Sequence, residues 1–112
     1  MVDSYSFGRM VISGNIYTSD LIILPDRINS SWWRKTGHHL CLEDLEEILD
    51  QNFDVLIIGT GYLGLMKIDE EVIQHARSVG FELIIENTEQ AVDKFNTISP
   101  QKKTIAAFHL TC

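Results

Sequence analysis

The sequence contains little cysteine, little proline and no long apolar run. Its two cysteines, Cys41 and Cys112, cannot form a disulfide framework, and neither belongs to a Cys-x-x-Cys pair. We therefore expect free thiols, no structural metal site and a reducing, cytoplasmic compartment. No apolar stretch approaches the roughly 20 residues that span a bilayer, and residues 1–5 lack the basic and apolar regions of a signal peptide. No membrane association is expected.

Basic residues are also scarce. Lysine and arginine number 9 against 16 aspartates and glutamates, which gives a formal net charge of −7. An acidic surface repels the phosphates of nucleic acids and of anionic lipids, so neither is an expected partner. We expect instead an unknown protein partner or a small anionic ligand, and a monomer or weak homo-oligomer.

The remaining composition is that of one globular domain. Hydrophobic residues make up 45% of the chain and charged residues 22%. A chain of 12.8 kDa buries about two-thirds of its extended surface when it folds, which is enough for a self-sufficient core. Residues 1–112 are therefore expected to form a single domain.

The N-terminal part of the chain predicts strands rather than helices. Residues 7–13 and 16–24 are rich in β-branched and aromatic side chains, and Gly14-Asn15 between them suits a two-residue turn. A β-hairpin is therefore expected. Pro25 ends its second strand, and residues 25–39 follow without a clear periodicity.

From residue 42 onwards, helical and strand patterns alternate. Apolar residues recur at helical spacing over 42–51, 69–79 and 88–99, the last with Thr88 as its N-cap, whereas the segments near 54–59, 81–86 and 103–110 are apolar runs of strand length. Such alternation with short connections predicts parallel strands joined by right-handed crossovers. The expected fold class is α/β, with a central mixed, mostly parallel sheet, flanking helices and the N-terminal hairpin.

The sharpest motif is Gly-Thr-Gly-Tyr-Leu-Gly at residues 59–64, a G-x-G-x-x-G directly after a predicted strand. With Glu86 at the end of the next strand, it matches the dinucleotide fingerprint. However, the following helix starts late, with three acids at 69–71 where a pyrophosphate would lie, so we expect no dinucleotide and no other cofactor. Two interpretations of residues 59–61 stay open: backbone N–H groups that face an anion, or a turn that simply needs positive φ or close packing.

A second candidate site lies in the irregular stretch, in the only locally basic segment. Trp33, Arg34, Lys35 and His38 can together hold an anionic or aromatic ligand, and loops commonly carry binding residues. The alternative is that one tryptophan fills the core while the cations are solvated. The adjacent histidines rarely point to one ion, so no metal site is expected, and spacing alone places no catalytic set.

The hairpin and four further segments can be read together: WWRK-x-GHH, LEDLEEIL, VLIIGTG and AVDKFNTI. They resemble the Mth-domain family of small uncharacterised proteins, which includes the adipogenesis-associated Mth domain-containing protein and a mitochondrial complex I assembly factor. The resemblance implies a three-layer fold in which the hairpin forms an extra β layer. It also points to Gly59, Gly61, Asn96 and one tryptophan of the 32–33 pair, and it implies no catalytic residues, because the family has no established set.

Two functions fit these observations. We favour a non-catalytic interaction or assembly module; the alternative is a small-anion-binding protein or an enzyme that uses a cleft near residues 59–61, and whether any reaction is catalysed stays open. A concave, partly polar pocket beside these residues would favour the alternative, and a flat apolar surface the module. The candidate binding residues are expected to converge on one cleft. They are Gly59, Thr60, Gly61, Trp33, Arg34, Lys35, His38 and Asn96.

Overall fold

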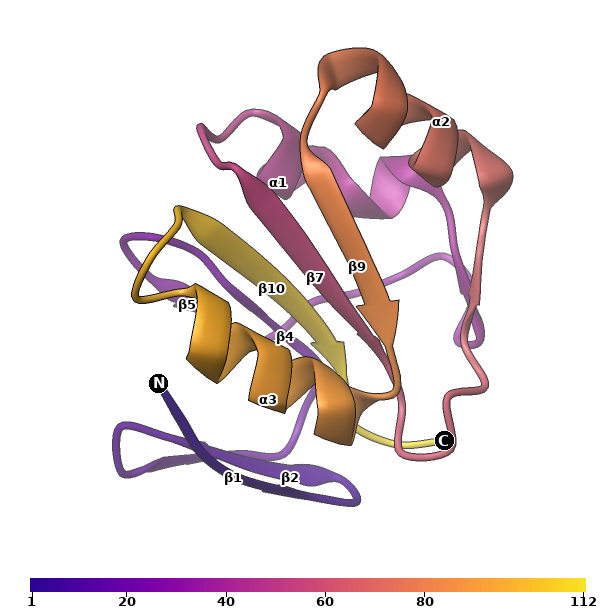
Figure 1. The fold of residues 1–112 in the computed structure, drawn as a ribbon. Helices are drawn as coiled ribbons and strands as arrows, with labels where there is room; N and C mark the ends of the chain where they lie inside the picture. The colour runs from indigo at the N-terminus through magenta and orange to yellow at the C-terminus, as the bar shows by residue number, and fades with distance from the viewer.

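The computed structural model describes residues 1–112, and its centre is a five-stranded mixed sheet (Figure 1). The strand order is β5-β4-β10-β7-β9. Strands β10, β7 and β9 run parallel, whereas β4 pairs antiparallel with both β10 and β5. The strands of this sheet are Leu21–Ile23 (β4), Ile28–Asn29 (β5), Val55–Thr60 (β7), Glu82–Glu86 (β9) and Thr104–His109 (β10).

Two inner strands of the sheet, β7 and β10, are buried along their whole length. Their sequences are apolar runs without polar alternation, as expected for strands covered on both faces. Val55 and Ile57 pack into one hydrophobic core, and Leu56 and Ile58 into a second. Because successive side chains of a strand point to opposite faces, one apolar run supplies both cores.

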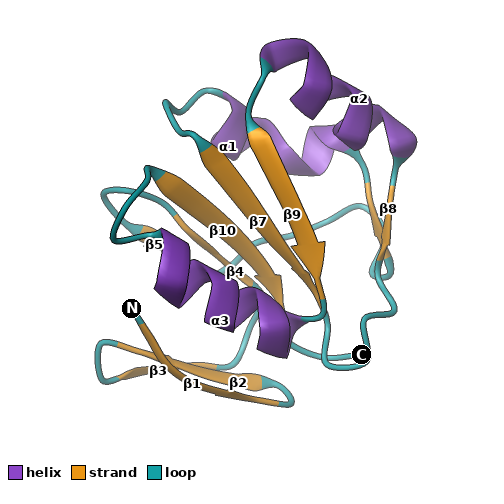
Figure 2. Cartoon of the chain, viewed as in Figure 1, coloured by secondary structure: helices purple, strands orange, loops and turns teal.

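One face of the sheet is covered by α3 (Thr88–Ile98), and a small N-terminal sheet packs on the outer side of that helix (Figure 2). Asn87 caps α3, because its side chain accepts a hydrogen bond from the Gln90 N–H. Ala91 and Phe95 belong to the first core, together with Val55 and Ile57 of β7. The outer sheet consists of β1 (Val2–Ser6), β2 (Arg9–Ile12) and β3 (Asn15–Tyr17) in that order.

The opposite face of the sheet carries the other helical segments. They are the 3₁₀ turn η1 (Leu42–Leu45), α1 (Glu46–Leu49) and α2 (Glu70–Val79), next to a two-stranded ladder of β6 (His39–Leu40) and β8 (Lys67–Ile68). Leu45, Ile48 and Val72 of these segments enter the second core. The parallel β6–β8 ladder joins the chain before η1 to the chain before α2. None of the helices is both long and apolar enough to cross a membrane.

The mixed α/β class is confirmed, and the five long elements after residue 54 begin and end within one residue of their predicted positions. The predicted helix over 42–51 is wrong in kind, because a 3₁₀ turn and a single α-helical turn take its place. The indole N–H of Trp32 donates to the Asp44 carbonyl at 3.0 Å. Leu45, at the junction of the two segments, has φ −106° and ψ 10°, outside the helical region, so they do not form one continuous helix.

The N-terminal hairpin also differs from its prediction. Its turn is Ser13-Gly14, one residue earlier than predicted, and both residues have positive φ (48° and 81°), as a type I′ turn requires. A further strand, β1, pairs with β2. Residues 21–23 do not belong to the hairpin but form β4 of the central sheet. Leu21 is buried in the first core and Ile22 in the second, so this strand is covered on both faces.

The attachment of the N-terminal sheet generates a test. Asn96 of α3 accepts a hydrogen bond from the Val2 N–H and donates one to the Val2 carbonyl, each at 2.9 Å. We expect Asn96→Ala to lower the free energy of unfolding by about 1–3 kcal/mol, because both bonds are lost. Urea denaturation measures this, and hydrogen exchange should show protection lost first in β1 and β2. The control Thr97→Ala loses only an exposed bond to the Asp93 carbonyl and should cost under about 0.5 kcal/mol. Equal losses in the two variants would contradict the anchoring role.

Candidate functional site

The parallel strands end together at one edge of the central sheet, where Thr60 of β7 lies opposite His109 of β10. We refer to this end as the carboxyl edge. Thr88, at the start of α3, joins both strands there. Its hydroxyl donates to the His109 carbonyl (2.6 Å) and accepts from the Gly61 N–H (2.9 Å). Thr88 is fully buried, so water does not compete for these bonds.

The turn that follows β7 is held by backbone hydrogen bonds from the end of the chain. The N–H of Tyr62 donates to the Thr111 carbonyl, and the N–H of Leu65 donates to the Cys112 carbonyl, both at 3.2 Å. Together with the Gly61 bond to the threonine hydroxyl, these contacts occupy three N–H groups of the turn. The Gly61 N–H, which was a candidate for an anion site, is therefore already bonded within the protein.

Close packing explains both glycines that flank Thr60. A Cβ at Gly59 would stand 2.8 Å from the Phe108 side chain and from the Thr88 hydroxyl. A Cβ at Gly61 would stand 2.4 Å from the Thr111 carbonyl oxygen, and the φ of Gly61 is +107°. Both positions leave no room for a side chain, and the second also requires a backbone conformation that favours glycine.

A buried ion pair lies beside the carboxyl edge. Arg34 Nη2 is 2.8 Å from Asp20 Oδ2, and only 5% of the Arg34 side chain is exposed. The same carboxylate is 2.7 Å from His109 Nδ1 and accepts from the Leu110 N–H, also at 2.7 Å. Arg34 Nη2 donates in addition to the Gly37 carbonyl at 3.1 Å. Asp20 thereby joins the start of β4, the end of β10 and the loop that carries Arg34.

The protonation of this cluster follows from its contacts. Burial raises the pKa of the Asp20 carboxyl, but hydrogen bonds from His109, the Leu110 N–H and Arg34 outweigh it and hold the pKa below its ordinary value. Asp20 is ionised and only accepts, so His109 Nδ1 carries a proton and donates to it. Arg34 Nη2, 3.1 Å from that nitrogen, is a second donor and makes no hydrogen bond with it. Three buried atoms lack a partner in the protein: Nε and Nη1 of Arg34, and Nε2 of His109.

The structure brings part of the predicted site together around His109. Arg34 meets its imidazole, and Gly61 is linked to its carbonyl through the threonine hydroxyl of α3. Thr60 lies beside it in the ladder. The His38 ring stands nearly perpendicular to the His109 ring, with centroids 6.3 Å apart. Residues from the glycine turn and from the basic loop therefore share the carboxyl edge.

The other predicted residues lie elsewhere. Trp33 is 76% exposed, whereas Trp32 fills the second core and stacks against the guanidinium of the arginine cluster. Lys35 and Trp33 line a shallow cleft on the helical side, where Lys35 Nζ is 2.5 Å from Glu43 Oε2. Asn96 has both polar groups of its amide engaged with β1. The tryptophan pair thus divides between core and surface.

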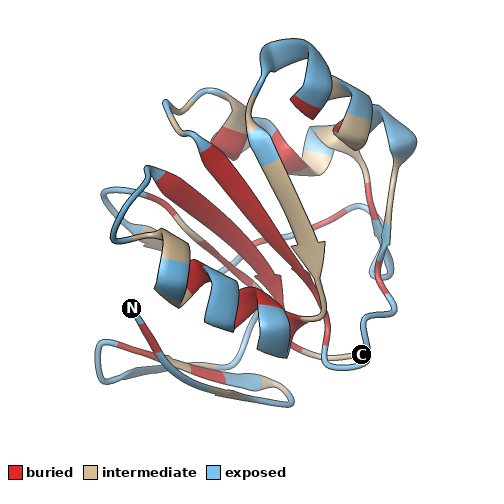
Figure 3. Ribbon diagram, in the orientation of Figure 1, coloured by how far each residue is buried: buried red, intermediate tan, exposed pale blue.

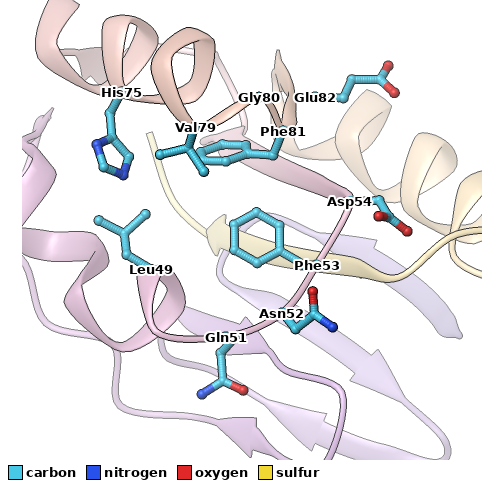
Figure 4. A pocket seen from close by; sticks show the side chains of 10 residues that line it. All are labelled: Leu49, Gln51, Asn52, Phe53, Asp54, His75, Val79, Gly80, Phe81 and Glu82. Carbon is cyan, nitrogen blue, oxygen red and sulfur yellow. The ribbon is translucent and has the colours of Figure 1, made fainter.

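The largest cleft lies at the other end of the sheet, where β7 and β9 begin (Figure 4). Its volume is about 420 Å³. Phe53 and Phe81 pack together in it with ring centroids 4.8 Å apart, and His75 lies 6.3 Å from Phe81. Figure 4 shows the carboxylates of Asp54 and Glu82 directed away from these rings. The cleft offers aromatic surface and one imidazole rather than a set of converging charged groups, and no predicted site residue lines it.

Exposed apolar side chains gather beside the glycine turn. Phe7, at the tip of the β1–β2 hairpin, contacts Tyr62 edge-on with ring centroids 5.8 Å apart, and Tyr5 lies 6.3 Å from the same ring. Leu63 and Leu65 follow in the same turn and are 67% and 53% exposed. Figure 3 shows this loop near the C-terminus as exposed. We refer to Phe7, Tyr62, Leu63 and Leu65 as the edge surface.

Comparison with known proteins identifies the family. The family model for DUF498/DUF598, described as a protein of unknown function, matches residues 2–110. The chain belongs to this family. It is similar to the conserved hypothetical protein PH1505 from Pyrococcus horikoshii OT3, with 28% identity and a TM-score of 0.86 over 100% of this chain and 99% of that one. MT938 matches with 25% identity and a TM-score of 0.81 over 100% and 98% of the two chains.

A third solved structure shares the fold alone. It is described as an outer membrane protein from Bartonella henselae, with 23% identity and a TM-score of 0.83 over 99% of this chain and 94% of that one. The fold thus extends over 94% or more of each of these three proteins. None of the three descriptions states an activity.

Three residues at the carboxyl edge of this DUF498/DUF598 chain are absent from the predicted site: Asp20, Thr88 and His109. The predicted helix cap at Thr88 is wrong, because Asn87 caps α3, which frees the threonine hydroxyl for the strand ends. His109 is the one imidazole in an apolar strand, and Asp20 directly precedes β4. Asp20 and His109 could have been found in the sequence as polar residues at the ends of apolar strands, where sites of open α/β sheets commonly lie.

The packing of the glycine turn generates a second test. We expect Gly61→Ala to lower the free energy of unfolding by at least about 2 kcal/mol more than Gly80→Ala, because the added methyl group is forced against the Thr111 carbonyl. Gly80 is a matched control, since it also has positive φ (+95°) but no atom lies within 4 Å of the Cβ position. Urea denaturation of both variants measures the difference. Similar losses would show that the turn is not closed by the end of the chain.

Proposed function

We propose that this protein is a non-catalytic interaction module and that a partner protein docks on the edge surface. One observation carries the proposal: the carboxyl edge exposes apolar side chains, and no cleft lies at the glycine turn. Open α/β sheets that bind small molecules do so in a crevice at this edge. Here the end of the chain packs against Gly61 instead.

The hydrogen bonds of the glycine turn favour a protein partner over a ligand held by the turn. Gly61, Tyr62 and Leu65 already donate their N–H groups within the protein. An anion at the turn would have to displace these bonds, each of which contributes about 1 kcal/mol. An apolar partner leaves them in place and covers the side chains of Tyr62 and Leu65.

The edge surface is held in place before any partner binds. The Tyr5 hydroxyl and the Gly8 N–H both donate to the Leu110 carbonyl at 2.8 Å, which fixes the hairpin tip that carries Phe7. Burial raises the pKa of Tyr5 to about 12, so this hydroxyl stays protonated at neutral pH. Aromatic side chains that are ordered in advance bind at a small entropic cost and often dominate interface energies.

The charge of the chain defines the chemistry of the partner. With a net charge of −7, the protein attracts a docking face that is apolar at its centre and carries lysine and arginine at its rim. The same charge opposes tight self-association and nucleic-acid binding, which supports a monomer or weak homo-oligomer. We place the protein in the cytoplasm, because its two thiols are unpaired.

We also propose that the relationship extends to the Mth-domain family and its three-layer arrangement. The position of α3 supports this, because the helix contacts β7 on one side and β1 of the N-terminal sheet on the other. An assembly role is compatible with this proposal, and an enzyme or anion-binding protein with a cleft near residues 59–61 is the alternative.

A photoreactive amino acid at position 63 of the full chain tests the proposal in cells. We expect a discrete cross-linked complex from position 63 and none from Val79, which is 64% exposed at the end of α2. The partner, once purified, should bind the wild-type chain. The double substitution Tyr62→Ser, Leu63→Ser should raise the Kd at least about tenfold, because it removes the centre of the interface. Val79→Ser should leave the Kd unchanged, and binding should weaken with added NaCl.

Three outcomes would contradict the proposal. The first is the absence of a complex at position 63, or the same complexes from both positions. The second is a purified partner whose Kd is unaffected by the double substitution. The third is a cross-linked dimer of this chain alone, which would replace the basic partner by a second copy.

A further inference from the structure

We propose that the free side of β9 binds an extended segment of another protein, which joins the five-stranded central sheet as one more strand. The segment is apolar at two alternate positions and carries lysine or arginine on both sides of them. The surface differs from the edge surface, because it consists of the backbone of β9 and a groove between this strand and α2.

The backbone of β9 has unused hydrogen-bonding groups. β9 is the last strand of the sheet and pairs only with β7. The Glu82 N–H donates to the Asp54 carbonyl at 3.0 Å, so the backbone of Glu82 faces β7. Because this direction alternates along a strand, Leu83 and Ile85 direct their N–H and carbonyl groups away from β7. These outward groups have no hydrogen-bond partner in the protein.

β9 also lacks the features that usually protect an edge strand from pairing. Natural edge strands are often very short, bulged or interrupted by proline. At the other edge of this sheet, β5 has only two residues, whereas β9 has five and follows β7 without a register shift. Its sequence, Glu-Leu-Ile-Ile-Glu, contains no proline. The free side of β9 is therefore a regular template for a further strand.

A groove beside β9 can receive side chains of the added strand. Its volume is about 300 Å³, and it is lined by Ile73, Ala76, Arg77, Phe81, Leu83 and Ile85. Residues opposite Leu83 and Ile85 in a paired strand point to the same face of the sheet as these two side chains. That face is the one that α2 covers, because Leu83 and Ile85 pack against the second core. The lining is apolar except for Arg77, so these two positions of the segment favour valine or isoleucine.

The glutamates at the two ends of β9 favour a basic segment over a second copy of this chain. Lys102 Nζ lies 3.5 Å from Glu82 Oε1, and Lys94 Nζ lies 3.3 Å from Glu86 Oε2, so one oxygen of each carboxylate is left for another cation. Antiparallel pairing of two β9 strands about Ile84 would place Glu82 of each copy opposite Glu86 of the other. Like charges in that position destabilise a sheet, whereas lysine or arginine there stabilises it.

An NMR titration of the ¹⁵N-labelled full chain with a synthetic peptide tests the proposal. The probe is acetyl-Thr-Lys-Val-Thr-Val-Lys-Thr-amide, whose valines oppose Leu83 and Ile85 and whose lysines oppose the two glutamates. We expect saturable shifts with a Kd of about 0.1–3 mM, largest at the N–H groups of Leu83 and Ile85. In the free protein these two amides should exchange faster than that of Ile84, which faces β7, and binding should slow them.

Two control peptides separate strand pairing from apolar contact and from charge. Methylation of both valine nitrogens removes the donors to the Leu83 and Ile85 carbonyls and should raise the Kd at least about tenfold. Glutamate in place of both lysines should raise it at least about fivefold. The double substitution Glu82→Lys, Glu86→Lys should reverse this charge preference. The control Glu89→Lys, at an exposed position on α3, should keep it.

Several results would overturn the proposal. One is the absence of saturation up to about 10 mM peptide. Another is an equal Kd for the methylated peptide, because it would exclude pairing through the backbone. A charge preference that the double substitution does not change would exclude the basic segment. Shifts of the same amides when the chain alone is concentrated, with a dimer in sedimentation, would make a second copy the occupant. If the double variant does not fold, the three peptides on the wild-type chain decide the matter.

Discussion

The carboxylate of Asp20 receives hydrogen bonds from three parts of the chain: the Arg34 guanidinium, the His109 imidazole and the Leu110 N–H. Removing it would leave a buried guanidinium without its counter-ion, which is strongly destabilising. It also fixes the end of β10, and the Leu110 carbonyl on the same residue accepts from Tyr5 and Gly8 of the N-terminal sheet. The placement of the hairpin tip therefore depends on the same carboxylate.

The network continues from β10 to the turn after β7. The His109 carbonyl accepts from the Thr88 hydroxyl, which in turn accepts from the Gly61 N–H. The carboxyl edge is thus an internally bonded structure in which polar groups face inward and the apolar side chains of Tyr62 and Leu63 face solvent. This division leaves apolar side chains on the surface of the carboxyl edge and its hydrogen-bonded polar groups inside.

The alternation of helices and strands was predictable because the local spacing of apolar residues differs between helices and strands. The strand β7 reads as one apolar run since both of its faces are buried, and the long elements after residue 54 follow the same local rules. The destination of residues 21–23 was not predictable locally. They pair with β10, more than eighty residues away in sequence. Their apolar, β-branched composition suits a strand of the N-terminal hairpin equally well, so composition does not distinguish the two partners.

The candidate site shows the same limit. The glycines of the turn were found from their motif, but the reason for them is contact with Thr111 and Cys112 at the far end of the chain. Arg34 was found as a basic loop residue, whereas its burial depends on Asp20 and on the ring of Trp32. Sequence spacing reveals residue types near strand ends, and tertiary pairing decides which of them are exposed.

Hydrogen exchange at the carboxyl edge tests the central claim, that internal hydrogen bonds close it, most directly. The N–H groups of Gly61 and Leu110 donate to Thr88 and Asp20 and should exchange as slowly as that of Ile57 in the middle of β7, since all three open only when the core unfolds. Residue-resolved exchange by NMR compares the three amides with the exposed amide of Gly37 as the fast reference. Exchange of Gly61 and Leu110 at the rate of Gly37 would contradict the account, because it would mean that the edge is open to water in the folded protein.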